Sequence, residues 1–283
     1  MKFRTEIEPV STGIRISHAD EIMMLGSCFT DSIGALMARD GFNVTANPMG
    51  AFYNPFIIRT IIDAALRGSQ FGEEHLVRDD DGIYHCLYFE SRRQGPDPHA
   101  LLASINRDFT EFSKRLRNAG TWIITLGTAW VFEHNASGTV VGNCHKFSAD
   151  EFTRVLLTVD TATSVIKQIM AMAGDRRVIF TVSPIRHLAD GLHGNTISKS
   201  ILQLALFNNN AEYFPAFEIL NDDLRDYRFY AADMKHPSDV AVQYIYDKFA
   251  DTYFTAETRR KAQEACREAR LRAHRQIIKQ TDK

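Results

Sequence analysis

The sequence predicts an α/β protein with a mainly parallel sheet of roughly five strands and helices on both faces. Short apolar runs alternate with segments of helical periodicity along most of the chain, which is typical of β-α-β units. The chain has 283 residues, a length within the range of one α/β domain with insertions. It contains no internal repeat, low-complexity tract or Pro/Gly/Ser-rich linker, and this favours a single domain.

The first part of the chain gives clear strand and helix patterns. Glu21–Leu25 is predicted to be a buried strand, followed by a turn and a helix over Asp31–Arg39. Gly41 can end that helix, and Phe42–Ala46 is predicted to be the second strand. Asn54-Pro55 begins a helix that runs to about Arg67, because proline is favoured at the first helical position.

Residues 72–97 interrupt this alternation. They are polar, contain one strand-like run at Ile83–Glu90, and are predicted to form an inserted hairpin. A helix over Pro98–Arg117 leads from this insertion to Trp122–Leu126, the third strand.

A second hairpin follows the third strand. Asn135–Gly138 is a turn sequence between the strand-like segments Trp130–Glu133 and Thr139–Val141. A long helix is then predicted over Asp150–Ala173, before the fourth strand at Arg177–Val182.

The last part of the predicted domain, which spans residues 1–255, completes the sheet. Ile197–Phe207 has a helical pattern, and Phe214–Ile219 is the candidate fifth strand. Pro215 within it indicates a sheet edge, because proline cannot donate a ladder hydrogen bond. Pro237–Phe254 is predicted to be the last helix of the domain.

Residues 256–283 differ from the rest of the chain, with nine Lys and Arg against four Asp and Glu. They are predicted to form a basic C-terminal helix or tail. One interpretation is a helix that docks on an acidic partner. The favoured one is a solvated helix packed loosely on the domain, because a helix rich in both signs of charge is commonly a solvated face.

Composition excludes several classes of partner. Hydrophobic residues make up 45% of the chain and the net charge is −2, which indicates neither nucleic acid nor an anionic membrane as the main partner. Residues 1–13 lack the apolar core of a signal peptide, and no apolar run reaches the ~18 residues of a membrane span. We therefore expect a cytoplasmic protein. Its four widely spaced cysteines are expected to be free thiols: Cys28, Cys86, Cys144 and Cys266.

The turn Gly26-Ser27-Cys28-Phe29 is the first candidate for chemistry. It lies between a buried strand and a helix, at the carboxyl edge of the sheet where open α/β folds bind ligands. Backbone N–H groups at a helix N-terminus stabilise a thiolate or alkoxide and can donate to an oxyanion. Ser27 and Cys28 are both competent nucleophiles. The alternative is that Ser27 caps the helix and Cys28 is a small core residue.

Asp233-Met234-Lys235-His236 is the second candidate. A catalytic histidine needs a carboxylate to fix its tautomer, and Asp233, three residues before His236, can do this locally. The segment follows the last predicted strand, from where a loop can return to the side of the sheet that carries the nucleophile.

Together these motifs resemble the SGNH, or GDSL-like, hydrolase superfamily. Gly26 aligns with the glycine of its first block, which places Cys28 at the nucleophile position and favours it over Ser27. The stretch Gly-Ser-Cys-Phe-Thr resembles one branch in particular, the GSCFA family. Further matches cover about residues 20–255, including Tyr53-Asn54-Pro55 and Ser183-Pro184-Ile185-Arg186-His187. The resemblance implies a three-layer α/β/α sandwich of flavodoxin-like strand order and acyl-group chemistry, with no cofactor and no metal.

The sequence departs from the superfamily at its third block. Gly127-Thr128-Ala129-Trp130 occupies that place, so the asparagine that donates to the oxyanion is absent. Loss of one such donor typically costs about 3–4 kcal/mol in the transition state. Candidate replacements are Thr128, Asn143 and Asn54, together with Gly50, the match to the glycine of the second block.

Two further residues are candidates for substrate binding. His145 lies in Asn143-Cys144-His145-Lys146, where adjacent Cys and His lack zinc-ligand spacing, and a buried structural role is the alternative. Arg186 follows the fourth strand and could bind a carboxylate or phosphate with two hydrogen bonds. An ion pair with Asp222, Asp223 or Asp226 is the alternative for this arginine.

The sequence thus predicts an acyl-group hydrolase or acyltransferase. His236, oriented by Asp233, deprotonates Cys28, and the resulting acyl-enzyme is resolved by water or an acceptor. The substrate would be an ester-type small molecule or an acylated glycan. A non-catalytic ligand-binding module on the same fold is the alternative. A nucleotide-binding protein ranks last, because no glycine-rich phosphate loop follows the first strand.

Overall fold

A five-stranded parallel sheet forms the centre of the protein. The computed structural model describes residues 4–11 and 13–281, with side chains of the C-terminal helix described as far as residue 272. The sheet has the order β11-β10-β6-β1-β2. Its strands are β1 (Glu21–Gly26), β2 (Asn43–Ala46), β6 (Thr121–Leu126), β10 (Arg177–Val182) and β11 (Tyr213–Phe214). Counted along the chain this order is 5-4-3-1-2, the flavodoxin-like order that was predicted, with its switch point between β1 and β6.

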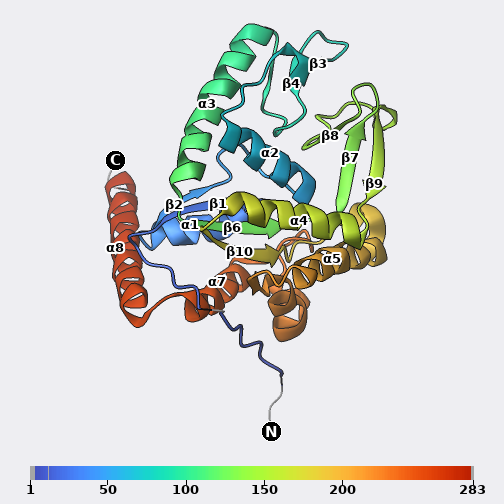
Figure 1. Ribbon diagram of the computed structural model, residues 1–283. Helices are drawn as coiled ribbons and strands as arrows, with labels where there is room; N and C mark the ends of the chain where they lie inside the picture. Colours follow the sequence, from blue (N-terminus) through green and yellow to red (C-terminus); the bar gives the residue numbers. More distant parts are fainter. Residues whose placement is uncertain (1–3, 12, 282–283) are drawn as a thin grey trace.

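Helices cover both faces of the sheet (Figure 1). The helices α1 (Cys28–Arg39) and α7 (Asp239–Tyr253) share one apolar core with one face. The other face packs against α2 (Pro55–Arg67), α3 (Pro98–Asn118), α4 (Val159–Ala173) and α5 (Gly191–Asn208). Successive residues of β1 alternate between the two cores, since Ile22 and Met24 lie in the first and Met23 and Leu25 in the second. The predicted α/β class with three layers is therefore confirmed.

Two small antiparallel sheets lie side by side at one end of the molecule (Figure 1). The insertion forms one of them, with strands β3 (Leu76–Arg78), β4 (Tyr84–Cys86) and β5 (Gln94–Gly95). The other has the order β8-β7-β9. Its strands are β7 (Trp130–His134), β8 (Thr139–Val141) and β9 (Phe152–Leu156). The N–H groups of Gly142 and Asn143 join the two sheets by donating to the carbonyl of Leu87 at 2.8 and 3.0 Å.

The predicted helix over Asp150–Ala173 is wrong in its first part. A 3-10 turn over Ala149–Glu151 leads into β9, which pairs along its whole length with β7. The helix begins only at Val159, where the hydroxyl of Thr158 accepts a hydrogen bond from the N–H of Thr161 at 3.1 Å. Pairing with an existing hairpin therefore determines the structure of residues 152–156.

The fifth strand and the last helix are shorter than predicted. Only Tyr213–Phe214 is a strand, and it lies at the sheet edge as expected. The chain then turns into α6 (Ala216–Glu218) and a π-helix over Ile219–Leu224, because Pro215 has no N–H for the ladder. In α7, Ser238 is the N-cap, and Pro237 lies outside the helix in a bridge to Tyr230.

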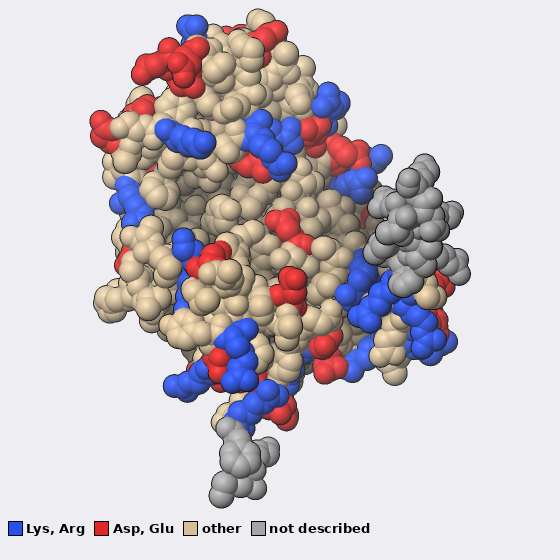
Figure 2. Space-filling model, turned by 180° about the vertical axis from the view of Figure 1, so that it is seen from behind, with Lys and Arg blue, Asp and Glu red and all other residues tan. Residues whose placement is uncertain are grey.

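The C-terminal helix α8 (Ala256–Thr281) packs on the domain through few residues. Thr258 and Ala262 are buried, whereas Arg260, Lys261 and Arg267 are exposed. Figure 2 shows Lys and Arg side chains gathered at this edge of the molecule, beside the grey atoms. The arginine at position 275 and the lysines at positions 279 and 283 lie outside the residues whose side chains are described.

The charges of α8 are partly paired with each other. Arg260 lies 3.2 Å from Glu264 and Lys261 lies 2.8 Å from Glu257, each one helical turn away. Such pairs are typical of a solvated helix face. In addition, no helix in the described part of the chain combines the length and apolarity of a membrane span.

Candidate active site

The turn after β1 brings Cys28 to the carboxyl edge of the sheet. Gly26 has a φ of +146°, and a Cβ atom there would lie 2.2 Å from the carbonyl oxygen of Thr125. Only glycine therefore allows β1 to turn this close to β6. The hydroxyl of Ser27 caps α1 by accepting from the N–H of Phe29 at 3.3 Å. Cys28 is thus the first residue of α1, three residues earlier than the predicted helix start.

Asp233 and His236 lie on a tight loop before α7. The N–H of Ala231 donates to the carbonyl of His236 at 2.8 Å and closes the loop. One carboxylate oxygen of Asp233 accepts from the N–H groups of Lys235 and His236, at 2.9 and 3.0 Å. Met234, between them, has a φ of +58°. The loop therefore fixes the Asp233 carboxylate through the backbone of the residues that follow it.

The structure brings Cys28, His236 and Asp233 into one hydrogen-bonded row. Cys28 Sγ lies 3.4 Å from His236 Nε2, and His236 Nδ1 lies 2.5 Å from Asp233 Oδ2. Because a carboxylate only accepts, it holds the proton on Nδ1 and leaves Nε2 to accept from the thiol. The backbone N–H groups of His236 and Lys235, together with the imidazole, hold the pKa of Asp233 well below its usual range.

The thiol of Cys28 is protonated until a base removes its proton. Burial raises the pKa of Cys28 above its usual value of 9.0. The backbone N–H groups of Cys28 and Phe29 lower it, and the carboxylate of Asp31 raises it. Desolvation prevails over the helix N-terminus here, so His236 is the group that can generate the thiolate.

Ser27 occupies a different environment from Cys28. Its side chain is 2% exposed, and its hydroxyl donates to the hydroxyl of Ser183 at the end of β10, at 3.0 Å. Its oxygen also caps α1. The geometry therefore gives Ser27 a structural role and places the neighbouring thiol, not this hydroxyl, beside the imidazole.

A protein-family model covers most of the chain. The model of the GSCFA family matches residues 21–249, which include Cys28, Asp233 and His236. The chain belongs to the GSCFA family. A search of the curated proteins finds no relative of significant similarity.

Residues 127–130, which occupy the place of the third block, make hydrogen bonds within the fold. The N–H groups of Gly127 and Thr128 both donate to the carbonyl of Tyr53, at 2.7 and 2.8 Å. A Cβ atom at Gly127 would lie 2.9 Å from that same oxygen, so glycine allows the close approach. The hydroxyl of Thr128 contacts Ser198 at 3.0 Å and the N–H of Trp130 at 3.1 Å. Thr128 is therefore committed to the loop after β6.

Gly50 and Asn54 lie on the segment between β2 and α2. The N–H of Gly50 already donates to the carbonyl of Asn47 at 2.9 Å, and its φ is +95°. The oxygen of Asn54 caps α2 by accepting from the N–H of Ile57 at 2.9 Å. The hydrogen bonds described for the Asn54 side chain use only its oxygen, so its amide N–H group is one donor that this segment still offers.

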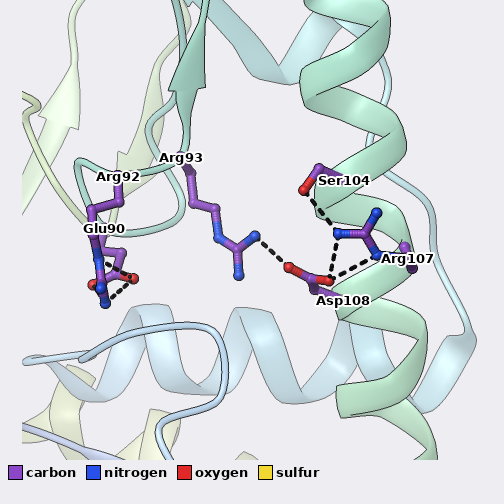
Figure 3. Close-up of polar contacts among 6 residues, drawn as sticks. All are labelled: Glu90, Arg92, Arg93, Ser104, Arg107 and Asp108. Carbon is purple, nitrogen blue, oxygen red and sulfur yellow. Dashed lines mark hydrogen bonds and ion pairs between the residues drawn. The ribbon is translucent and has the colours of Figure 1, made fainter.

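The insertion reaches this segment through Glu90. A Cβ atom at Gly50 would lie 2.9 Å from the carboxyl carbon of Glu90. Arg92 binds the Glu90 carboxylate through two nitrogens. The next residue, Arg93, points away from Glu90 toward α3 and pairs with Asp108 at 2.6 Å (Figure 3). Glu90 is thus held against the segment between β2 and α2, and its charge adds to desolvation in raising the pKa of Asp31.

Asn143 and His145 belong to another cluster. The oxygen of Asn143 accepts from the N–H of His145 at 2.8 Å. His145 Nδ1 lies 3.2 Å from Nδ1 of His85, whose Nε2 lies 2.7 Å from Asp79. His145 Nε2 lies 2.9 Å from the carbonyl of Phe89. These bonds hold the insertion, and none of them involves Cys28 or His236.

The imidazole rings of His85 and His145 form a hydrogen-bonded chain, and the group at each end of this chain is a hydrogen-bond acceptor. A carboxylate lies at one end and a carbonyl at the other, so a full set of hydrogen bonds requires three protons on the two imidazoles. The pair then carries one positive charge opposite Asp79. Burial lowers the pKa of His145, whereas the hydrogen bond from His85 lowers the pKa of Asp79 and keeps it anionic. The cluster lines a hollow of about 720 Å³.

Arg186 lies beside the loop that carries Asp233 and His236. Its guanidinium stacks over the ring of Tyr230 at 3.9 Å and lies 5.2 Å from that of Tyr227. The backbone N–H of Arg186 donates to the carbonyl of Lys235 at 3.2 Å. The ion pairs described for Asp223 and Asp226 join them to Arg4 and Arg228 instead. Arg186 therefore contacts the loop of Asp233 and His236 through its backbone N–H, while its guanidinium stacks on the two tyrosines that precede this loop.

Two site residues escaped the sequence analysis. The side chain of Asn47 accepts from the N–H of Gly26 at 2.9 Å and donates to the carbonyl of Ser27 at 3.3 Å, and so holds the nucleophile turn. Lys199 is 1% exposed on α5. Its spacing from Asn195, Leu202 and Leu206 places it on the buried side of the helix, a signal that the sequence contains.

Metal ligands do not gather at this site. No group of three or more His, Cys, Asp or Glu residues in the described part of the chain could hold a metal ion. All four cysteines are free thiols, as expected.

Proposed function

We propose that this protein is an acyl-group hydrolase or acyltransferase that forms a covalent acyl-enzyme on Cys28. The observation that carries this proposal is the distance of 3.4 Å between Cys28 Sγ and His236 Nε2, with Asp233 behind the imidazole. A nucleophile, a base and a group that orients the base are the three parts of a nucleophilic catalytic centre. The substrate we propose is an ester-type small molecule or an acylated glycan.

The reaction begins when His236 Nε2 takes the proton of the Cys28 thiol. The thiolate attacks the carbonyl carbon of the substrate, and the carbonyl electron pair moves to oxygen. Collapse of this tetrahedral intermediate breaks the bond to the leaving group, which takes the proton from His236. A thioester on Cys28 and a free alcohol result. Water or an acceptor hydroxyl or amine, deprotonated by His236, then attacks the thioester and releases Cys28.

Two groups are candidate donors for the oxyanion. The backbone N–H of Cys28 lies in the first turn of α1, where N–H groups have no acceptor within the helix. The amide of Asn54 is the side-chain candidate, because Thr128 and the N–H of Gly50 are bonded elsewhere. A poorer oxyanion site slows hydrolysis but is tolerated by a thioester, which is reactive toward amines and alcohols.

A short-chain p-nitrophenyl ester and intact-mass analysis test this proposal. We expect the wild-type protein and Ser27→Ala to gain the mass of one acyl group, and Cys28→Ala to gain none. Peptide mapping should locate the group on Cys28. Acylation of Cys28→Ala together with loss of acylation in Ser27→Ala would refute the assignment of the nucleophile.

A non-catalytic ligand-binding module is the second candidate. It is favoured by the use of Thr128 and of the N–H groups of Gly127 and Thr128 for structure, which leaves this side of the site without the expected donor. This alternative predicts that the wild-type protein binds the p-nitrophenyl ester but forms no acyl-enzyme with it. The same mass measurement therefore separates the two functions.

A further inference from the structure

Lys199 joins the ends of two strands beneath the catalytic turn. Its Nζ donates to the carbonyl of Gly127 after β6 at 2.6 Å and to that of Ser183 after β10 at 2.8 Å. Ser183 in turn accepts from the hydroxyl of Ser27, the residue before Cys28. A single residue, Ser183, therefore links Lys199 to Ser27, which precedes the proposed nucleophile Cys28. Lys199 is buried from solvent.

The charge of Lys199 has no anion in contact with it. Both of its acceptors are neutral carbonyls, and no ion pair to it is present among the described residues. A buried ammonium is normally paired with a carboxylate, since burial of an unpaired charge is expensive. Burial lowers the pKa of Lys199 to about 7, and the group that raises it is the Cys28 thiolate.

We propose that Lys199 is a positioning residue whose buried ammonium stabilises the thiolate of Cys28. This inference rests on the proposed function only in taking Cys28 as the reactive thiol. The two ionisations are coupled in both directions. A protonated Lys199 lowers the pKa of Cys28, and the Cys28 thiolate raises the pKa of Lys199. When His236 removes the proton of Cys28 below about pH 7, where Lys199 is protonated, the negative charge forms with this cation already in place.

A purely structural role does not require a lysine. The neighbouring Ser198 ties the same loop to α5 with a neutral hydroxyl, which accepts from the N–H of Ala129 at 2.7 Å. A neutral donor at position 199 would hold the two carbonyls without the cost of burying a charge. The charge therefore needs a function of its own, and the nearby thiolate supplies one.

The rate of alkylation of Cys28 by iodoacetamide, measured against pH, tests this inference. Lys199→Gln keeps amide donors for the carbonyls but removes the charge, and Lys199→Met removes both. Because the pKa of Lys199 is about 7, the variants are compared with the wild type below pH 7, where the lysine is charged. There we expect both variants to be alkylated about tenfold more slowly than the wild type, the order that one unit charge produces at an effective dielectric constant of about 20. The rate is read from the peptide that contains Cys28, because three other thiols are present.

Ser198→Ala is the matched control. It loosens the same loop without a change of charge, so its alkylation rate below pH 7 should remain that of the wild type. If Lys199→Gln folds and keeps the wild-type rate below pH 7, the lysine is only structural and the inference is overturned. An equal loss of rate in Ser198→Ala would also overturn it.

A second measurement needs no change at position 199. The side chain of Lys199 is titrated by NMR with ¹³C-labelled lysine in the wild type and in Cys28→Asp, which carries a permanent anion at the nucleophile position. Coupling predicts a higher pKa of Lys199 in Cys28→Asp, and an unchanged value would overturn the inference. Neither experiment uses an acyl substrate, so failure of acyl-enzyme formation and failure of this coupling are separate results.

Discussion

Cys28 Sγ lies 3.4 Å from His236 Nε2, although the two residues are 208 positions apart in the sequence. Each stands at the start of a helix or just before one, and the helices α1 and α7 share one apolar core on the same face of the sheet. The packing of Ile33 and Met37 against residues such as Ile245 and Phe249 therefore sets the geometry of the site. The fold holds the pair together before any substrate binds.

Removal of the base should abolish most of the acylation. We expect His236→Ala to lower the rate of acyl-enzyme formation by about 10²–10⁴-fold at neutral pH, the usual contribution of a general base. The thiol, whose pKa burial raises, then has no group to take its proton. Stopped-flow release of p-nitrophenol measures the rate. His193→Ala, which removes an exposed histidine of α5, is the control and should react like the wild type.

Asp233→Asn tests the orientation of the imidazole. Asparagine can still accept from the N–H groups of Lys235 and His236, but it presents a donor to Nδ1 and so favours the tautomer with its proton on Nε2. We expect acylation to fall roughly tenfold or more while the melting temperature is unchanged. A rate equal to that of the wild type would show that the carboxylate does not fix the tautomer.

Ser27→Ala should cost stability and leave the chemistry intact. Its hydroxyl caps α1, and loss of such a cap typically costs about 1 kcal/mol. Urea denaturation measures this value, and Ser238→Ala, which removes the cap of α7, should lose a similar amount. Acyl-enzyme formation on Cys28 should persist in Ser27→Ala. A stable but unreactive Ser27→Ala would assign this serine a chemical role.

Much of the sheet, and the proximity of Cys28, His236 and Asp233, could be predicted from the sequence. Each parallel strand is a continuous apolar run that can be recognised from its own residues, so the predicted bounds of four of the five strands agree with the structure to within one residue. Cys28 was singled out because a glycine and a helix start flank it, and His236 because Asp233 lies three residues ahead. These signals are local, and the topological rule that parallel strands end at one edge then brings them together.

What could not be predicted depends on long-range pairing. Residues 152–156 form a strand only because β7 offers them an open edge, and the sequence alone favours a helix there. The commitment of Thr128 to Ser198 joins β6 to a helix 70 residues later, and Lys199 meets the ends of two separate strands. Such contacts decide which polar groups remain available to a substrate, and no local pattern encodes them.

Asp79 should stabilise the insertion more than the protein as a whole. It accepts from His85 at 2.7 Å and from the N–H of Ile83 at 2.8 Å, whereas Asp81 lines the same hollow without these bonds. We expect Asp79→Ala to speed hydrogen exchange of the amides of residues 76–95 and to leave those of β6 unchanged. Asp81→Ala is the control. Equal exchange in the two variants would contradict the role assigned to Asp79.

The stability of the protein should rise with pH above neutrality because of Lys199. Its pKa is about 7 in the folded protein against 10.5 in an unfolded chain, so the unfolded chain binds more protons between these values. The free energy of unfolding then increases with pH in that window, by at most about 1.4 kcal/mol per pH unit for one group. In Lys199→Met this increment is absent. The difference between the two proteins isolates the lysine from the thiols and tyrosines that also titrate there, and urea denaturation at pH 7, 8 and 9 measures it. A difference that stays constant across this range would mean that Lys199 keeps its ordinary pKa in the folded protein.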